Sequence, residues 1–312
     1  MFGSHGPSFL LTQSVNGLMQ HLPGVRDGVE ESIHQSRVAI RRTRETLALA
    51  RTTLDDDELA AIEWRLAAGF RALGRARDAD IAHKLVHHME LRFPLAPATL
   101  GHLRSSVIAE QLLTRRKVIK KLEKLNLDML PQQLRHIARA KFTLRDADWK
   151  GPLRHQLARR AEGVRTSLQH ASGVYLPNRA HSVRVAMKQL RYTMELADIT
   201  GAWRAPLALR VLKKAQKALG EAHDRELLLL ARLRDLARAG AELKQTEVNA
   251  VEQFIRAEAV ALHSRYVARR SDILLICDAC ESALRSRSLR AGALLAVGVA
   301  VPSLLLLSRN DP

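Results

Sequence analysis

Apolar residues recur along this chain at a spacing that places them on one face of a helix. Ile33, Ile40 and Leu47 follow one another at intervals of about two turns, and Met187 and Met194 repeat that interval. Proline and glycine, which interrupt helices, fall between such segments and set their ends. The pattern predicts an all-α fold with helices over about residues 27–53, 57–91, 97–126, 131–146, 152–173, 179–200, 206–239 and 243–286.

Composition supports the helical prediction and adds a strong positive charge. The 312 residues contain only 16 Gly and 10 Pro, few enough for long helices, and the length suits one or two domains. Fifty Lys and Arg residues against 32 Asp and Glu leave a formal net charge of +18. Because like charges repel within a compact fold, so large an excess indicates binding to nucleic acid, acidic lipid or another polyanion.

One motif occurs twice, as HQSRVAIRRTR from His34 and as HSVRVAMKQLR from His181. In each copy a His is followed by basic residues three, seven and ten positions later, so the four side chains share one helical face. At about 1.5 Å per residue, each face carries a basic stripe about 15 Å long, which suits an extended anion. The two basic stripes consist of His34, Arg37, Arg41 and Arg44, and of His181, Arg184, Lys188 and Arg191.

A second duplicated element follows each basic stripe, as LGRARDAD from Leu73 and as LGEAHDRE from Leu219. The duplication divides the chain into two related halves, about residues 23–147 and 148–290. It predicts a pseudo-two-fold axis that brings the two basic stripes together across one cleft, where their fields add. Gly74 and Gly220 within this element predict the close approach of another helix.

Carboxylates and further cations accompany the duplicated element. Asp78 and Asp224 lie one turn after its glycines and are predicted to hold Arg side chains in place; the alternative is a divalent cation that bridges the anion. Two further cations precede the glycines, and four others repeat a common spacing in the two halves. These secondary basic candidates are Arg71, Lys217, Arg116, Lys120, Arg265 and Arg269.

The two ends of the chain differ from its helical body. Residues 1–22 contain Gly, Ser and Pro and are expected to form a loose arm or a short helix. Residues 291–307 carry no charge and follow three arginines, which fits a membrane tail anchor with the main body in the cytoplasm. A final core helix, or a tail docked on a hydrophobic partner surface, fits the same segment, and these alternatives stay open.

Other chemistry has little support in the sequence. Cys277 and Cys280, the only cysteines, exclude a disulfide framework and are expected to be small buried side chains, and no signal-peptide pattern is present, so we expect a cytoplasmic protein. His83 and His87 have a zinc-compatible spacing but no third ligand nearby in the sequence, so we expect no metal. No Walker A or GxGxxG motif occurs, so we expect no cofactor.

The doubled basic stripe and the LGxx[RH]D element that follows it resemble the CHAD family, the conserved histidine α-helical domain, over about residues 20–290. The resemblance implies two four-helix bundles related by internal two-fold symmetry, with a basic central channel that binds inorganic polyphosphate through the residues of the basic stripes. Nothing matches the triphosphatase domain that precedes the bundles in some members. The resemblance therefore implies a stand-alone, non-enzymatic binding module.

Two other functions stay open at this point. The first is nucleic-acid binding, which the 4% aromatic content disfavours because single strands are held by base stacking. The second is a phosphohydrolase or phosphotransferase that uses His34 or His181, although no carboxylate cluster for two metal ions accompanies them. Polyphosphate granules are a further candidate location, and the sequence does not indicate an oligomeric state.

Overall fold

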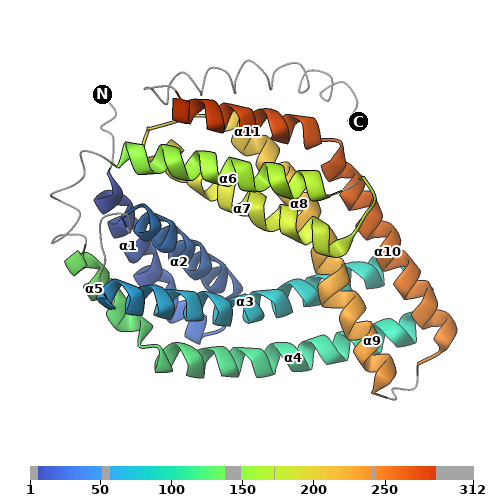
Figure 1. Cartoon of the computed structure of the whole chain (residues 1–312). Coiled ribbons are helices and arrows are strands. Elements are labelled where there is room, and N and C mark those ends of the chain that lie inside the picture. The colour runs from blue at the N-terminus through green and yellow to red at the C-terminus, as the bar shows by residue number, and fades with distance from the viewer. Residues whose placement is uncertain (1–5, 51–56, 138–148, 172, 240–242, 286–312) are drawn as a thin grey trace.

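The computed structural model describes residues 6–50, 57–137, 149–171, 173–239 and 243–285. Every regular element in these ranges is helical, which confirms the all-α prediction (Figure 1). The elements of the first half are α1 Pro7–Arg26, α2 Glu30–Ala50, α3 Asp57–Arg92, α4 Pro97–Lys124, the 3-10 turn η2 Leu127–Met129 and α5 Leu130–Ile137. Those of the second half are α6 Lys150–His170, α7 Pro177–Ile199, α8 Pro206–Asp224, the π-helical segment η4 Arg225–Leu230, α9 Ala231–Arg238, α10 Gln245–Val267 and α11 Arg270–Arg285.

Helices pack in the same order in both halves. In the first half α1 packs on α2, α2 on α3, α3 on α4, and α5 on α1. In the second half α6 packs on α7, α7 on α8, α8 on α10, and α11 on α6. This agreement is what an internal duplication produces. The pseudo-two-fold relation between the halves stays a prediction that the packing order is compatible with.

Apolar side chains of the described residues form three main cores. One lies among α1, α2, α5 and the adjoining ends of α3 and α4, and a second among α6, α7, α8 and α11. The third joins the far ends of α3 and α4 to η4, α9 and α10. It arises because α3 has 36 residues, or about 54 Å of helix, and reaches well beyond the first core (Figure 1). The two halves share this core, and their arrangement as two bundles stays a prediction that is compatible with it.

The N-terminal segment corrects one prediction. Instead of a loose arm or short helix over residues 1–22, α1 is a helix of 20 residues whose Leu11, Val15 and Leu18 are fully buried. Gly17 and Pro23 have low helix propensity, so the sequence pattern of this segment does not predict a long helix. A Cβ at Gly17 would lie 3.7 Å from that of Ala39, so α1 packs closely on α2. By position and packing, α1 is the first-half counterpart of α6.

The C-terminal part of the second half also differs from the prediction. The helix expected over 243–286 is broken after Val267, and the chain turns so that α11 packs on α6. Tyr266 and Ile273 on the two sides of this turn are both buried in the second core. Cys277 and Cys280 on α11 are fully buried there too, and burial raises the pKa of the Cys277 thiol to about 12.

The candidate membrane segment, residues 291–307, lies outside the described residues. Among the helices that the structure does describe, none is both long and apolar enough to cross a bilayer.

Candidate anion-binding cavity

A cavity of about 610 Å³ lies where α2, α3, α6 and α7 meet. Seven cationic side chains line it against four carboxylates, and His34 adds a group that can take up a proton. We call it the basic cavity. Its cations are Arg37, Arg41 and Arg44 from α2, Arg77 from α3, Arg160 from α6, and Arg184 and Lys188 from α7; its carboxylates are Glu45, Glu63, Asp78 and Asp224.

The two helices that carry the basic stripes meet at Tyr192 of α7. The guanidinium carbon of Arg41 lies 3.9 Å from the centroid of the Tyr192 ring, and Arg41 Nη1 donates to the Tyr192 hydroxyl over 3.2 Å. Arg191 also lies against this ring, 4.8 Å from its centroid. The ring thus fixes an arginine of the first stripe against the second helix. Sequence reasoning missed Tyr192 because it stands outside the shared pattern of cations.

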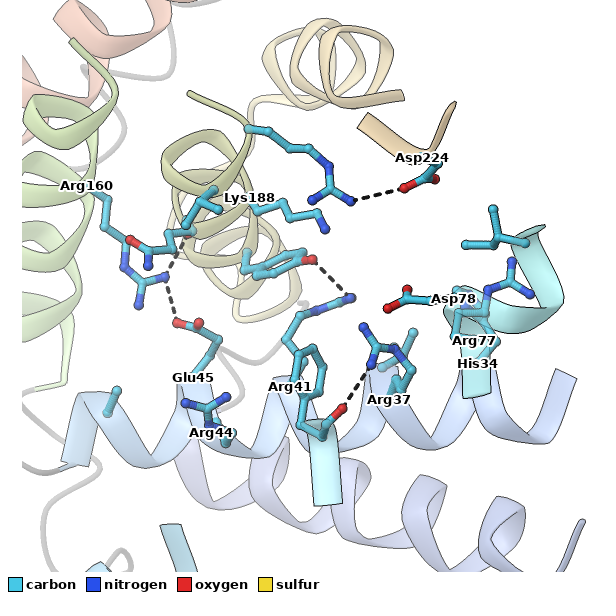
Figure 2. Close-up of a pocket in the computed structure, with 18 of the residues that line it drawn as sticks. His34, Arg37, Arg41, Arg44, Glu45, Arg77, Asp78, Arg160, Lys188 and Asp224 are labelled. Atoms are coloured by element: carbon cyan, nitrogen blue, oxygen red, sulfur yellow. Dashed lines mark hydrogen bonds and ion pairs between the residues drawn. The ribbon is translucent and has the colours of Figure 1, made fainter. Parts of the chain in front are cut away.

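Arg160 of α6 ties three helices together at one edge of the basic cavity. Its Nη1 lies 2.7 Å from Oε2 of Glu45 on α2 (Figure 2). The same nitrogen donates over 2.7 Å to the carbonyl oxygen of Gln189 and to the hydroxyl of Thr193, both on α7. These contacts all use Nη1 and join α6 to both other helices, so Arg160 positions α2 against α7. No motif marks it in the sequence, where it is one of two adjacent arginines.

Arg37 is held against α3 at the glycine of the duplicated element. Its Nη1 donates to the carbonyl oxygen of Phe70 over 2.9 Å, and its guanidinium lies 4.3 Å from the Phe70 ring centroid. A Cβ at Gly74 would lie only 2.7 Å from that Nη1. Gly74 therefore makes room for an arginine side chain, which corrects the expected close approach of a helix. At Gly220 the nearest atom is Arg184 Nε at 3.7 Å, an ordinary contact.

The two glycines are expected to respond differently to alanine. Gly74→Ala should displace the Arg37 guanidinium and lower the affinity for a polyanion severalfold; the gain in helix propensity of about 1 kcal/mol is offset by the strained Arg37 contact. Gly220→Ala should raise the free energy of unfolding by up to about 1 kcal/mol and leave affinity unchanged. Chemical denaturation and calorimetric binding measure both effects. Equal affinities for the two variants would contradict this role of Gly74.

The carboxylates Asp78 and Asp224 face the arginines of both stripes (Figure 2). Arg184 Nη2 lies 3.9 Å from Asp224 Oδ1, and His223 Nδ1 lies 3.4 Å from the same oxygen. Burial raises the pKa of Asp78; Arg37 opposes that rise, and the charge of Asp224 adds to it. Among the described residues, no group of three or more His, Cys, Asp and Glu has a geometry suited to a metal ion.

Cations in the basic cavity repel one another, and their pKa values reflect it. Burial, together with the charges of Arg184 and Arg37, lowers the pKa of Lys188 to about 8, and the nearby Asp224 opposes this shift only in part. The pKa values of Arg37 and Arg41 are lowered by burial as well. His34 is more exposed to solvent than these residues, but partial desolvation of its ring and the charge of Arg77 lower its pKa too. A bound anion would relieve this repulsion.

Of the eight stripe residues, the structure places six around the basic cavity and two outside it. His181 lines a separate cavity, where its ring stacks on that of His223 with centroids 4.9 Å apart. Arg191 is ion-paired with Glu195 over 2.7 Å. Arg71 lines a neighbouring groove. The other secondary candidates lie outside the basic cavity, and these are Lys217, Arg116, Lys120, Arg265 and Arg269.

The placement of the two histidines predicts different effects on pH dependence. Burial and the charge of Arg77 lower the pKa of His34 from that of an ordinary histidine, which favours the neutral ring in the empty cavity, and an anion that contacts the ring raises that pKa. Affinity for a polyanion should therefore rise severalfold as the pH falls from the higher pKa of His34 in the complex to its lower pKa in the empty cavity. His34→Gln should remove the rise and His181→Gln should keep it, as measured by calorimetry from pH 7.5 to pH 5.5. An unchanged pH profile in His34→Gln would remove His34 from the site.

Comparison with known proteins connects this architecture to a family. The family model described as "CHAD domain" matches residues 10–234. The crystal structure of the CHAD domain from the plant Ricinus communis is 21% identical, with a TM-score of 0.61 over 92% of this chain and 94% of that one. PptA from Streptomyces chartreusis is 14% identical, with a TM-score of 0.60 over 84% of this chain and 96% of that one. A search of curated proteins found no match.

Proposed function

The chain belongs to the CHAD-domain family, and we propose that it binds inorganic polyphosphate in the basic cavity without cleaving it. One observation carries this proposal: seven cationic side chains from four helices of both halves face one cavity of about 610 Å³. Arginine presents a planar fork of donors that suits phosphate oxygens, and Lys188 adds a mobile point charge. A flexible chain with a charge on every unit satisfies many such donors at once.

The aromatic rings of the basic cavity favour polyphosphate over nucleic acid. Phe70 and Tyr192 line it, and one face of each ring is occupied, by Arg37 at 4.3 Å and by Arg41 at 3.9 Å. Single-stranded nucleic acid is typically held by bases that stack on free aromatic faces. Arginines that stack on these rings compete with bases for the same faces, which favours phosphate contacts as the main source of affinity. A polymer composed of phosphate alone exploits such a site best.

Two of the four carboxylates of the basic cavity support binding rather than catalysis. Glu45 is engaged by Arg160 and Asp224 by Arg184, at 2.7 and 3.9 Å. A general base must be free to accept a proton from the attacking water or hydroxyl. Carboxylates that hold arginines in place are instead positioning groups, which fits a site that retains its ligand.

Competition tests the proposed ligand, and phosphate release tests the absence of hydrolysis. Fluorescently labelled long-chain polyphosphate should stay bound when RNA or duplex DNA is added at equal phosphate concentration, and unlabelled polyphosphate should displace it. Affinity should fall steeply with salt because each contacted phosphate releases counterions. Displacement by nucleic acid at comparable concentration would contradict the proposal. Release of orthophosphate with Mg²⁺ or Mn²⁺ present would establish the enzymatic alternative.

Cellular location follows from the proposed ligand. A protein that holds long polyphosphate chains is expected to collect on polyphosphate granules in the cytoplasm. A fluorescent fusion should form foci in cells that make polyphosphate and a diffuse signal in cells that do not. The same fusion without residues 291–312 separates granule binding from any attachment through the apolar tail. Foci that persist without polyphosphate would contradict granule targeting.

A further inference from the structure

Lys188 is the only lysine among the described residues that line the basic cavity. It lies within α7, one helical turn after Arg184, so the two side chains share a helical face. Figure 2 shows the Lys188 side chain pointing into the space that Arg41 and Asp78 also face. A helix held in the bundle thus presents a primary amine to the interior of a cavity lined by arginines.

Lys188 differs from most arginines of the basic cavity in having no bonded partner. It forms neither a hydrogen bond nor an ion pair with any described residue, and the surrounding charges act on its amine from a distance. An amine that no carboxylate or carbonyl oxygen holds is free to react with a bound molecule. The arginines that do donate a hydrogen bond or form an ion pair with a described neighbour are Arg37, Arg41, Arg77, Arg160 and Arg184.

The surroundings of Lys188 also make its amine a nucleophile. Burial and the charges of Arg184 and Arg37 disfavour the ammonium form, so the pKa of Lys188 is about 8. A carbonyl carbon is attacked by the lone pair of the neutral amine, which the ammonium form lacks. A substantial fraction of Lys188 is therefore reactive near neutral pH, although the amine lies among cations that attract phosphate groups.

We propose that Lys188 is a modification site for acyl phosphates, small anions in which a carboxylic acid is joined to a phosphate group. The arginines around Lys188 bind the phosphate group and bring the adjoining carbonyl carbon to the amine. The Lys188 nitrogen forms a bond to that carbon. The bond from the carbon to the bridging phosphate oxygen breaks, and its electron pair leaves on orthophosphate. The proton of the attacking amine passes to the departing phosphate or to water, and Lys188 becomes a neutral amide.

The cations of the basic cavity favour phosphate as the leaving group. Negative charge grows on the bridging oxygen as the bond to the carbonyl carbon breaks, and a guanidinium such as that of Arg184 stabilises a phosphate anion with paired donors. An acyl donor with a neutral leaving group gains nothing from these donors before the reaction begins. The basic cavity therefore selects acyl phosphates by binding the group that departs.

Acylation of Lys188 is expected to weaken polyphosphate binding. The amide has no charge, so the basic cavity loses one of its cations, and the acyl group occupies part of its volume. This consequence rests on the proposed function, whereas the modification itself does not require it. The protein would then release polyphosphate when acyl phosphates accumulate.

Two acyl donors and a matched pair of variants test the modification. The full-length protein is treated with acetyl phosphate or with the uncharged donor N-hydroxysuccinimidyl acetate, and mass spectrometry gives the acetylation rates of Lys188 and of Lys120, which lies on the exposed surface of α4. The ratio of the two rates, acetyl phosphate over uncharged donor, should be at least about tenfold higher at Lys188. Arg184→Gln should lower this ratio at Lys188 severalfold, and Arg116→Gln on the surface of α4 should leave it unchanged.

The comparison of donors separates phosphate binding from the reactivity of the amine itself, because the uncharged donor reports only the latter. An equal ratio at Lys188 and Lys120 would overturn the proposal. The same ratio at Lys188 in Arg184→Gln and in the wild type would also overturn it, because the neighbouring arginine would then play no part.

Polyphosphate binding after treatment tests the consequence of acylation. Acetylated wild-type protein should bind long-chain polyphosphate about tenfold more weakly than untreated protein, and the same treatment of Lys188→Arg should change its affinity little. Equal losses in both proteins would assign the effect to other lysines and overturn this consequence. Failure of untreated wild-type protein to bind the polymer would instead overturn the proposed function and leave the modification of Lys188 standing.

Discussion

Reversing the charges of Arg41 and Lys188 together is expected to lower the affinity for long-chain polyphosphate by at least about 100-fold. These side chains come from the two different helices that carry the basic stripes, and both line the basic cavity. A hydrogen bond to a charged partner contributes about 1.5–3 kcal/mol, so two lost contacts give about 3 kcal/mol or more. Calorimetry at constant salt measures the loss in Arg41→Glu with Lys188→Glu.

A matched variant controls for the change in net charge. Arg265→Glu with Arg269→Glu reverses one charge in the last turn of α10 and one just after it, both outside the basic cavity, and should change affinity by less than about threefold at physiological salt. Circular dichroism should show that both variants keep their helix content, because glutamate at residues 41 and 188 adds negative charge to a positive environment. An affinity for long-chain polyphosphate equal to that of the wild type in Arg41→Glu with Lys188→Glu would show that the basic cavity is not the binding site.

Raising the pH from 7 to 9 is expected to weaken polyphosphate binding about tenfold through Lys188. Its pKa is about 8 in the empty cavity, so it is mostly charged at pH 7 and mostly neutral at pH 9. Bound phosphate favours the charged ammonium and raises this pKa, so binding takes up a proton at alkaline pH. The contribution of the Lys188 charge to affinity is fully present below about pH 8. It is lost as the pH rises from about 8 to the higher pKa that Lys188 has in the complex.

Lys188→Arg is the control for this pH dependence. A guanidinium stays charged over the whole range, so the variant should keep its affinity between pH 7 and pH 9. Calorimetry in buffers of different ionisation enthalpy should also show proton uptake at pH 9 for the wild type and much less for the variant. A parallel fall in affinity for both proteins would assign the pH dependence to another group.

Much of the helical architecture follows from sequence periodicity, and its limits have physical causes. Most helix ends fall within a few residues of the Pro and Gly breaks, because these residues interrupt backbone hydrogen bonding wherever they fall. One exception is the break after Val267 between α10 and α11, which no Pro or Gly marks. Another is α1, whose buried Leu11, Val15 and Leu18 lie in a segment that also contains Gly17 and Pro23. Packing on α2 compensates for their weak helix propensity, and local sequence does not reveal that compensation.

The sequence predicts which helical faces carry the basic residues, but it does not predict which of these residues reach the basic cavity. A helical wheel gives the direction of a side chain around its axis, so it places His181 and Arg184 on one face. It does not say how far along that axis the partner helix extends, and His181 lies beyond the basic cavity. Arg160 and Tyr192 reach the site through contacts between helices distant in sequence. Contacts between helices that are distant in sequence leave no pattern in the residues around either partner.

Protection of Lys188 from chemical modification tests the central claim most directly. At pH 8 its amine is about half deprotonated and open to acylation, whereas Lys120 on the exposed surface of α4 serves as an internal reference in the same molecule. Saturating long-chain polyphosphate should strongly reduce acylation of Lys188 and leave that of Lys120 unchanged, as quantified by mass spectrometry. Equal modification of Lys188 with and without saturating polymer would show that polyphosphate does not occupy the basic cavity.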